Sequence, residues 1–231
     1  MEELNLLQRV AVWAIPVLFA ITIHETAHGW MALRLGDPTA KMLGRLTLNP
    51  IKHIDPIGTI LVPGVLLMVG GFLFGWAKPV PITWENLRRP KHDMAWVAAA
   101  GPLSNLLMAL FWAMLARLGL ALGGFSEGVA LFLIYVGVAG LFVNTILMLL
   151  NLLPLPPLDG SRVVSALLPP RLAYRYEQIE PWGLPILLVL LITGMLGKIL
   201  WPLITTTLLG LAAVAGMKAE TFQYVLYTLL N

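Results

Sequence analysis

The sequence predicts an all-α polytopic membrane protein with about five to six transmembrane or re-entrant helical segments and a small membrane-associated β element. The chain of 231 residues is 58% hydrophobic and only 12% charged, whereas soluble domains carry about 25% charged residues. The apolar residues also form runs long enough to cross a bilayer. The length fits one domain, 1–231, and the lack of cysteine excludes disulfides and thiolate chemistry. We expect the lipid bilayer as a partner and no nucleic acid.

The first predicted span covers residues 10–33. At 1.5 Å per residue it would extend about 36 Å, which is enough to cross a bilayer. Its only ionisable side chains are His24, Glu25 and His28. Ionisable groups at membrane depth are costly, so they indicate function by default.

Two short stretches favour extended structure. Residues 44–50, GRLTLNP, alternate apolar and polar side chains, and residues 77–82, AKPVPI, contain prolines that suit an edge strand. Between them, residues 56–77 are apolar but rich in glycine and proline, and basic clusters flank them on both sides. A full crossing would place one basic cluster outside, against the positive-inside tendency. We therefore expect re-entry from the cytoplasmic face, with a proline-kinked crossing as the alternative.

The remaining predicted spans follow in order. Residues 94–116 contain no charged side chain, and residues 128–158 end in the proline-rich LLPLPPLDG stretch. Residues 181–217 are apolar apart from an interruption at Lys198 and Trp201-Pro202, which allows either one long tilted helix or a hairpin of two.

The HETAH stretch, residues 24–28, carries the chemistry of the first span. His24 and His28 are four residues apart, so on a helix both imidazoles lie on one face and can reach one metal ion. Glu25 is placed to polarise a water molecule, which completes the HExxH zinc-peptidase pattern. The alternative is two histidines that hydrogen-bond between helices, with a paired glutamate.

Catalytic zinc has three protein ligands, so the two histidines need a partner. Asp159 is the strongest candidate because the predicted topology brings it to the membrane face near His28. Its alternative role is to begin a helix at Ser161. The other candidates are His53, His92, Asp37, Asp55 and Asp93.

Three stretches together resemble the signature motifs of the site-2 proteases, which are intramembrane zinc metalloproteases: HETAH (24–28), AGPLSN (100–105) and NLLPLPPLDG (151–160). The stretches GRLTLNPIKHIDPIGT (44–59) and FGWAKPVPI (74–82) resemble the compact prokaryotic subgroup without a PDZ domain. The resemblance covers about residues 21–162. It implies a catalytic core at about 10–165, with C-terminal helices at 181–217 that carry no comparable motif.

The resemblance also implies roles for single residues. His24, His28 and Asp159 would bind one Zn²⁺ per chain, and Glu25 would be the general base. Asn151 would hold the substrate near the metal.

Three further polar residues have less settled roles. Asn105 could bond across to a neighbouring helix as a structural group. His53 could support the metal site, regulate it, or be an interfacial side chain. Asn144 is interpreted as a packing residue.

The implied function is hydrolysis of peptide bonds within or near transmembrane segments of membrane-protein substrates by metal-activated water. The protein would be a multi-pass protein of the cell membrane with its active site toward the cytoplasmic side. Residues 44–50 or 77–82 would hold the unwound substrate as an edge strand. No oligomeric state follows from the sequence.

Three alternatives remain open. One is a zinc peptidase whose third ligand is Glu177 or Glu180. The others are a membrane metal transporter and a catalytically inactive regulatory homologue.

Overall fold

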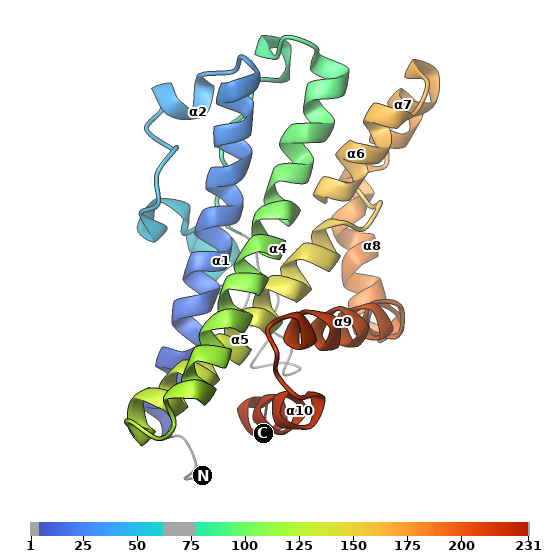
Figure 1. Cartoon of the computed structure of the whole chain (residues 1–231). Helices are drawn as coiled ribbons and strands as arrows, with labels where there is room; N and C mark the ends of the chain where they lie inside the picture. Colours follow the sequence, from blue (N-terminus) through green and yellow to red (C-terminus); the bar gives the residue numbers. More distant parts are fainter. Residues whose placement is uncertain (1–4, 62–76, 231) are drawn as a thin grey trace.

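The computed structural model describes residues 5–61 and 77–230, which are helical at most positions. Four helices are long and apolar enough to cross a membrane: α1 (Leu6–Leu35), α4 (Pro90–Leu122), α5 (Glu127–Asn151) and α9 (Met195–Val214). This confirms an all-helical membrane protein. Figure 1 shows α1, α4 and α5 running side by side.

The first helix has well-defined ends. At its start Gln8 N donates to Asn5 Oδ1, and Asn5 N donates to Gln8 Oε1, both at 2.9 Å, which satisfies two otherwise unpaired groups. It ends at Gly36, whose φ of 117° suits glycine.

Glycines allow α4 and α5 to pack closely. A Cβ atom added at Gly137 would lie 2.6 Å from Ala116 N, and one at Gly140 would lie 2.3 Å from the Trp112 ring. Helices in membranes associate largely through such contacts between small residues, because apolar side chains gain little by leaving lipid. These glycines therefore set the spacing of the helix pair that supports the site.

The remaining helices are shorter: α2 (Thr39–Met42), α6 (Asp159–Leu167), α7 (Pro170–Glu177), α8 (Glu180–Ile192) and α10 (Ala219–Leu230). Three short helical turns, η1 (Pro50–His53), η2 (Pro56–Leu61) and η3 (Trp84–Asn86), precede α4 in the chain. Of these, η1 packs on α1 and η3 on α4. The stretch 181–217 forms two helices, α8 and α9, which a turn at Gly194 (φ 70°) separates.

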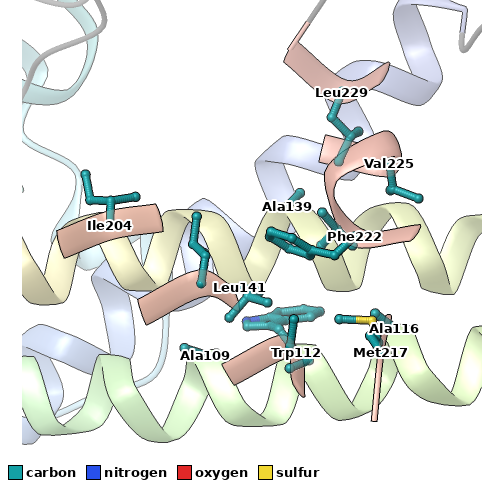
Figure 2. Close-up of a cluster of buried hydrophobic side chains, with 14 of the residues drawn as sticks. Ala109, Trp112, Ala116, Ala139, Leu141, Ile204, Met217, Phe222, Val225 and Leu229 are labelled. Carbon is teal, nitrogen blue, oxygen red and sulfur yellow. The ribbon is translucent and has the colours of Figure 1, made fainter. Parts of the chain in front are cut away.

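In Figure 1, α9 and α10 lie beside the lower half of α5, and α9 also contacts α4. Figure 2 shows Phe222 and Met217 gathered around the Trp112 ring with Leu141, which joins α4 and α5 to the C-terminal helices.

The predicted β element is not supported, since neither 44–50 nor 77–82 forms a strand in the part of the chain that the structure describes. The physical reason is that side chains take the groups that a partner strand would use. Thr47 O accepts from Thr26 Oγ1 at 3.0 Å and pairs with His53 Nε2 at 2.9 Å, and Lys78 O accepts from Arg45 Nη2 at 2.9 Å. Pro79 and Pro81, in addition, have no N–H to donate.

The predicted count of about five to six segments is also not supported. Four described helices qualify as spans, and α8, with 13 residues, is shorter than a span requires. Most of the expected segment 56–77 falls on residues 62–76, outside the described residues. Its flanks do meet, because Lys78 N donates to His53 O at 2.9 Å.

Residues 77–89, here called the linking segment, are attached to the end of α1 through Asp37. Asp37 is fully buried. Its carboxylate accepts from Thr83 N at 2.8 Å, from Asn86 Nδ2 at 3.1 Å and from Thr39 N at 3.0 Å. Burial by itself raises the pKa of Asp37, but the hydrogen bonds from Thr39, Asn86 and Thr83 outweigh it and hold the pKa below its ordinary value.

Candidate metal centre

Helix α1 presents His24 and His28 on one face, as their spacing predicts. Both imidazoles are more than nine-tenths buried, and their Nε2 atoms lie 3.1 Å apart. The two rings are nearly perpendicular, at 84°. The two nitrogens therefore converge on one point.

Asp159 completes the group from the other end of the core. Helix α5 ends at Asn151, and a proline-rich turn with a cis bond between Pro156 and Pro157 leads into α6, which begins at Asp159. Its Oδ2 atom lies 3.2 Å from His24 Nε2 and 3.4 Å from His28 Nε2. The turn is tight, because a Cβ atom at Gly160 would lie 2.3 Å from Leu152 O.

The Nδ1 atom of each ring has an oxygen partner on a neighbouring helix. His24 Nδ1 lies 2.6 Å from Asn105 Oδ1, and His28 Nδ1 lies 2.7 Å from Val97 O. A backbone carbonyl only accepts, so His28 donates from Nδ1, and in the neutral ring its Nε2 carries the lone pair. Such contacts orient imidazole ligands and select their tautomer.

Gly101 of α4 leaves the space that the rings occupy. A Cβ atom there would lie 2.3 Å from His28 Nε2 and 2.6 Å from His24 Cε1. Glycine in a helix costs about 1 kcal/mol relative to alanine, so its presence in mid-helix needs a local reason. Contact with both imidazoles supplies that reason.

This arrangement fits a tetrahedral metal ion. A zinc ion with bonds of about 2.0 to 2.1 Å holds its ligand atoms about 3.3 Å apart, and the three separations here are 3.1, 3.2 and 3.4 Å. Asp159 Oδ2 is buried and receives no hydrogen bond from the residues that the structure describes. A cation bound between these three atoms would satisfy the lone pairs that converge there.

Glu25 lies next to this group without belonging to it. Its side chain is half-buried, and its Oε2 atom accepts a hydrogen bond from Val80 N at 2.9 Å. Val80 lies between Pro79 and Pro81 and is buried. The linking segment thus fixes the orientation of the carboxylate beside the three ligand atoms.

Two further predicted residues, Asn151 and His53, make contacts outside the group of three ligand atoms. Asn151 is half-buried, and its amide donates to Leu147 O at 2.9 Å within α5. His53 is 2% exposed, and its Nδ1 atom has no hydrogen-bond partner among the described residues. It lines a small cavity together with Thr22 of α1. The substrate-binding role of Asn151 and any functional role of His53 stay predictions.

The other candidate ligands have structural partners. Glu180 pairs with Arg162 at 2.8 Å, and Glu177 accepts from Ser165 Oγ at 2.5 Å. Asp93 accepts from Arg89 N at 2.8 Å at the start of α4. Within the described ranges, the single group of three or more that could hold a metal is His24, His28 and Asp159. This geometry favours Asp159 over Glu177 and Glu180 as the third donor, and the assignment stays a prediction.

Sequence reasoning did not single out Val97 or Gly101. It considered Asp37 only as a candidate metal ligand, and it interpreted Asn144 as packing. Gly101 and Asn105 lie within AGPLSN, so that motif contains two of the residues that contact the imidazoles. Val97 contributes only a backbone carbonyl, which any residue would supply.

Comparison with known proteins identifies relatives that are named putative zinc metalloproteases. The Bacillus subtilis protein named "Putative zinc metalloprotease YwhC" is 41% identical over 218 residues, which is 92% of this chain and 93% of that protein. The proteins named "Putative zinc metalloprotease Rip2" are 33% identical in Mycolicibacterium smegmatis and 30% identical in Mycobacterium tuberculosis, each over 78% of this chain and 66% of the relative. No family model matches the chain, and no solved structure matches it.

Proposed function

Because the chain belongs to the zinc metalloprotease family that includes YwhC, we propose that it is an intramembrane zinc endopeptidase that cleaves peptide bonds within or near transmembrane segments of other membrane proteins. The observation that carries this proposal is the triangle formed by His24 Nε2, His28 Nε2 and Asp159 Oδ2. Its edges suit one tetrahedral ion, and Glu25 lies beside His24 in the same helix.

His24, His28 and Asp159 would hold one zinc ion per chain. Zinc, when bound, supplies a Lewis acid that makes a water molecule more acidic and withdraws charge from a carbonyl oxygen. Glu25 would take a proton from the attacking water and pass it to the leaving amine nitrogen. Since Val80 N occupies Oε2, Oε1 is the atom that would take this proton.

The substrate would be a transmembrane protein or peptide whose helix is locally unwound. Asn151 would help to hold it, because a carboxamide donates to a carbonyl and accepts from an amide. Its amide donates to Leu147 O in the present structure, so this role requires the side chain to rotate.

We also assign the chain to the compact site-2 protease subgroup, as one domain over 1–231. The order of the motifs HETAH, AGPLSN and NLLPLPPLDG supports this assignment. The contact between Lys78 N and His53 O supports re-entry of 56–77, since the two flanks meet at one place. Re-entry keeps both basic clusters on one face, which favours an active site toward the cytoplasmic side of the cell membrane.

The two non-enzymatic alternatives have less support. A transport path would need metal-binding groups along its length, whereas the described residues contain one such group. An inactive homologue would lack part of the machinery, but the three donors and Glu25 are all present.

The test uses the full chain purified in detergent, with zinc analysis and cleavage of a transmembrane peptide. Glu25→Gln should retain one zinc per chain and lose about 10²- to 10⁴-fold in cleavage rate. Asp159→Ala should lose both zinc and cleavage. Glu220→Gln, at the start of α10, is the matched control and should behave as wild type. Full cleavage by Glu25→Gln, or a wild-type chain without zinc, would contradict the proposal.

A further inference from the structure

A chain of hydrogen bonds runs from α5 through α4 to the first metal ligand on α1. Asn144 and Asn105 are both fully buried in the bundle. Asn144 Nδ2 donates to Gly140 O at 2.8 Å, and Asn105 Nδ2 donates to Asn144 Oδ1 at 2.9 Å. Asn105 Oδ1 then faces His24 Nδ1 at 2.6 Å.

This chain has only one possible direction. Gly140 O is a backbone carbonyl, so it can accept but not donate, and Asn144 must turn its NH₂ toward it. Asn144 consequently turns its oxygen toward Asn105, and Asn105 must donate to it from its own NH₂ group. The oxygen of Asn105 is then left for His24, which must carry a proton on Nδ1 to meet it.

We propose that Asn144 is a positioning residue for the metal site: through Asn105, it determines which ring nitrogen of His24 carries the proton. With that proton on Nδ1, the lone pair of Nε2 points at His28 Nε2 and Asp159 Oδ2. His28 needs no such relay, because Val97 O contacts its Nδ1 directly. The inference rests on the proposed zinc function and extends it to a residue outside the three motifs.

Asn105 alone would hold this orientation weakly. Its other described acceptor is Ala20 O, at a long 3.4 Å, whereas Asn144 Oδ1 is at 2.9 Å. Without Asn144, the carboxamide of Asn105 could turn over and present its NH₂ to His24. His24 would then carry its proton on Nε2 and could not bind a metal there.

The experiment measures the zinc dissociation constant of the detergent-solubilised chain by competition with a chelator, and the melting temperature of the metal-free protein. Asn144→Leu has a similar size but no acceptor, so zinc binding should weaken by about tenfold or more. Asn144→Asp is the rescue variant, since a neutral carboxyl group gives O–H to Gly140 O and C=O to Asn105. Its zinc affinity should stay close to that of wild type.

Thr145→Val is the matched control. Thr145 is the next residue of α5, is fully buried, and has a hydroxyl without a hydrogen-bond partner among the described residues. This variant removes a buried polar atom outside the hydrogen-bonded chain and should leave zinc affinity unchanged. Equal weakening by Thr145→Val and Asn144→Leu would overturn the inference.

Asn105→Asp, added to Asn144→Leu, gives a second rescue. A carboxylate presents an oxygen to His24 in either orientation, so the double variant should bind zinc more tightly than Asn144→Leu. If Asn144→Leu does not fold, Asn144→Thr replaces it, because its shorter hydroxyl can satisfy Gly140 O without reaching Asn105. Thr206 and Thr228 donate to the carbonyls four residues earlier in this chain.

Two further results would overturn the inference: wild-type zinc affinity in Asn144→Leu or its threonine substitute, or equal losses in Asn144→Asp and Asn144→Leu. A wild-type chain that binds no zinc would remove the proposed function and this inference together. A wild type that binds zinc alongside an unaffected Asn144 variant removes the inference alone.

Discussion

The two ends of the molecule bury different kinds of side chain. Every buried polar or charged side chain among the described residues lies between Thr22 and Ser165. The buried positions of α8, α9 and α10 are glycine or apolar side chains, with Phe222, Val225 and Leu229 forming the inner face of α10. The division falls close to residue 165, where the sequence motifs end.

This difference shows which region depends on precise side-chain geometry. Buried polar groups need partners at specific distances and angles, so the region around α1, α4 and α6 tolerates little change. Apolar contacts have no preferred direction, so the C-terminal helices can support the bundle without defining the site. Substitutions in the two regions should therefore separate metal affinity from stability.

Phe222→Ala should have the largest effect on stability and none on the metal site. Phe222 is 2% exposed and packs in the cluster around Trp112 (Figure 2). Truncating a buried phenylalanine costs about 3 kcal/mol or more through the cavity that it leaves. Thermal unfolding in detergent measures this loss, while the zinc dissociation constant should stay unchanged. Weakened zinc binding in the folded variant would contradict the separation of metal affinity from stability.

Gly101→Ala should have the opposite signature. The added methyl group would lie within 2.6 Å of both imidazoles, so the rings must move and zinc affinity should fall by about 10- to 100-fold. Gly210→Ala in α9 is the control, because nothing lies within 4 Å of the position of its Cβ atom. That control should keep zinc affinity and gain up to about 1 kcal/mol in helix stability. Similar zinc affinities in the two variants would contradict the role of Gly101.

Asp37→Asn should have a moderate, pH-dependent effect. Because its folded-state pKa is lowered, Asp37 stabilises the protein fully above its ordinary pKa of about 3.9. This contribution disappears as the pH falls through the lower folded-state pKa. The substitution should cost about 1 to 3 kcal/mol at neutral pH. Unfolding measured from neutral to acidic pH should show the variant and wild type converging at low pH. A constant gap across that range would argue against the carboxylate as the cause.

Glu180→Gln tests the junction of the two regions and should have the smallest effect. Arg162 of α6 contacts both carboxylate oxygens of Glu180 on α8 at 2.8 Å, but Glu180 is 42% exposed. Exposed ion pairs contribute about 0.2 to 1 kcal/mol. The expected loss is therefore under about 1 kcal/mol, with zinc affinity close to wild type. A large loss of zinc would mean that this ion pair holds α6, and Asp159 with it, in place.

The sequence predicted the helical membrane fold and the three side chains that the structure brings together as a possible metal site, because each leaves a local or motif signal. His24 and His28 are related by one helical turn, and Asp159 lies in a stretch that resembles a known signature. The β element was wrong because proline and alternation describe an extended backbone without saying what pairs with it. Here Arg45 and Thr26 provide that pairing from their side chains.

The contacts that orient the site were harder to predict, because tertiary packing creates them. Asn144 lies 39 residues from Asn105, and nothing in its local sequence indicates that the two amides meet. The role of Gly101 was equally hard to predict, because this residue acts by leaving space for two side chains of another helix.

Asp159, the candidate third donor, begins helix α6, which makes few contacts with α1. Helix α6 packs on α4 and α7 rather than on α1, so the metal itself would form the principal bond between the two ligand-bearing helices. Without the metal, a proton on one imidazole would be needed to hold the two ring nitrogens and the carboxylate 3.1 to 3.4 Å apart. Helix α4 packs on both α1 and α6. A chelator would therefore remove the direct link between the two ligand-bearing helices while α4 still joins them.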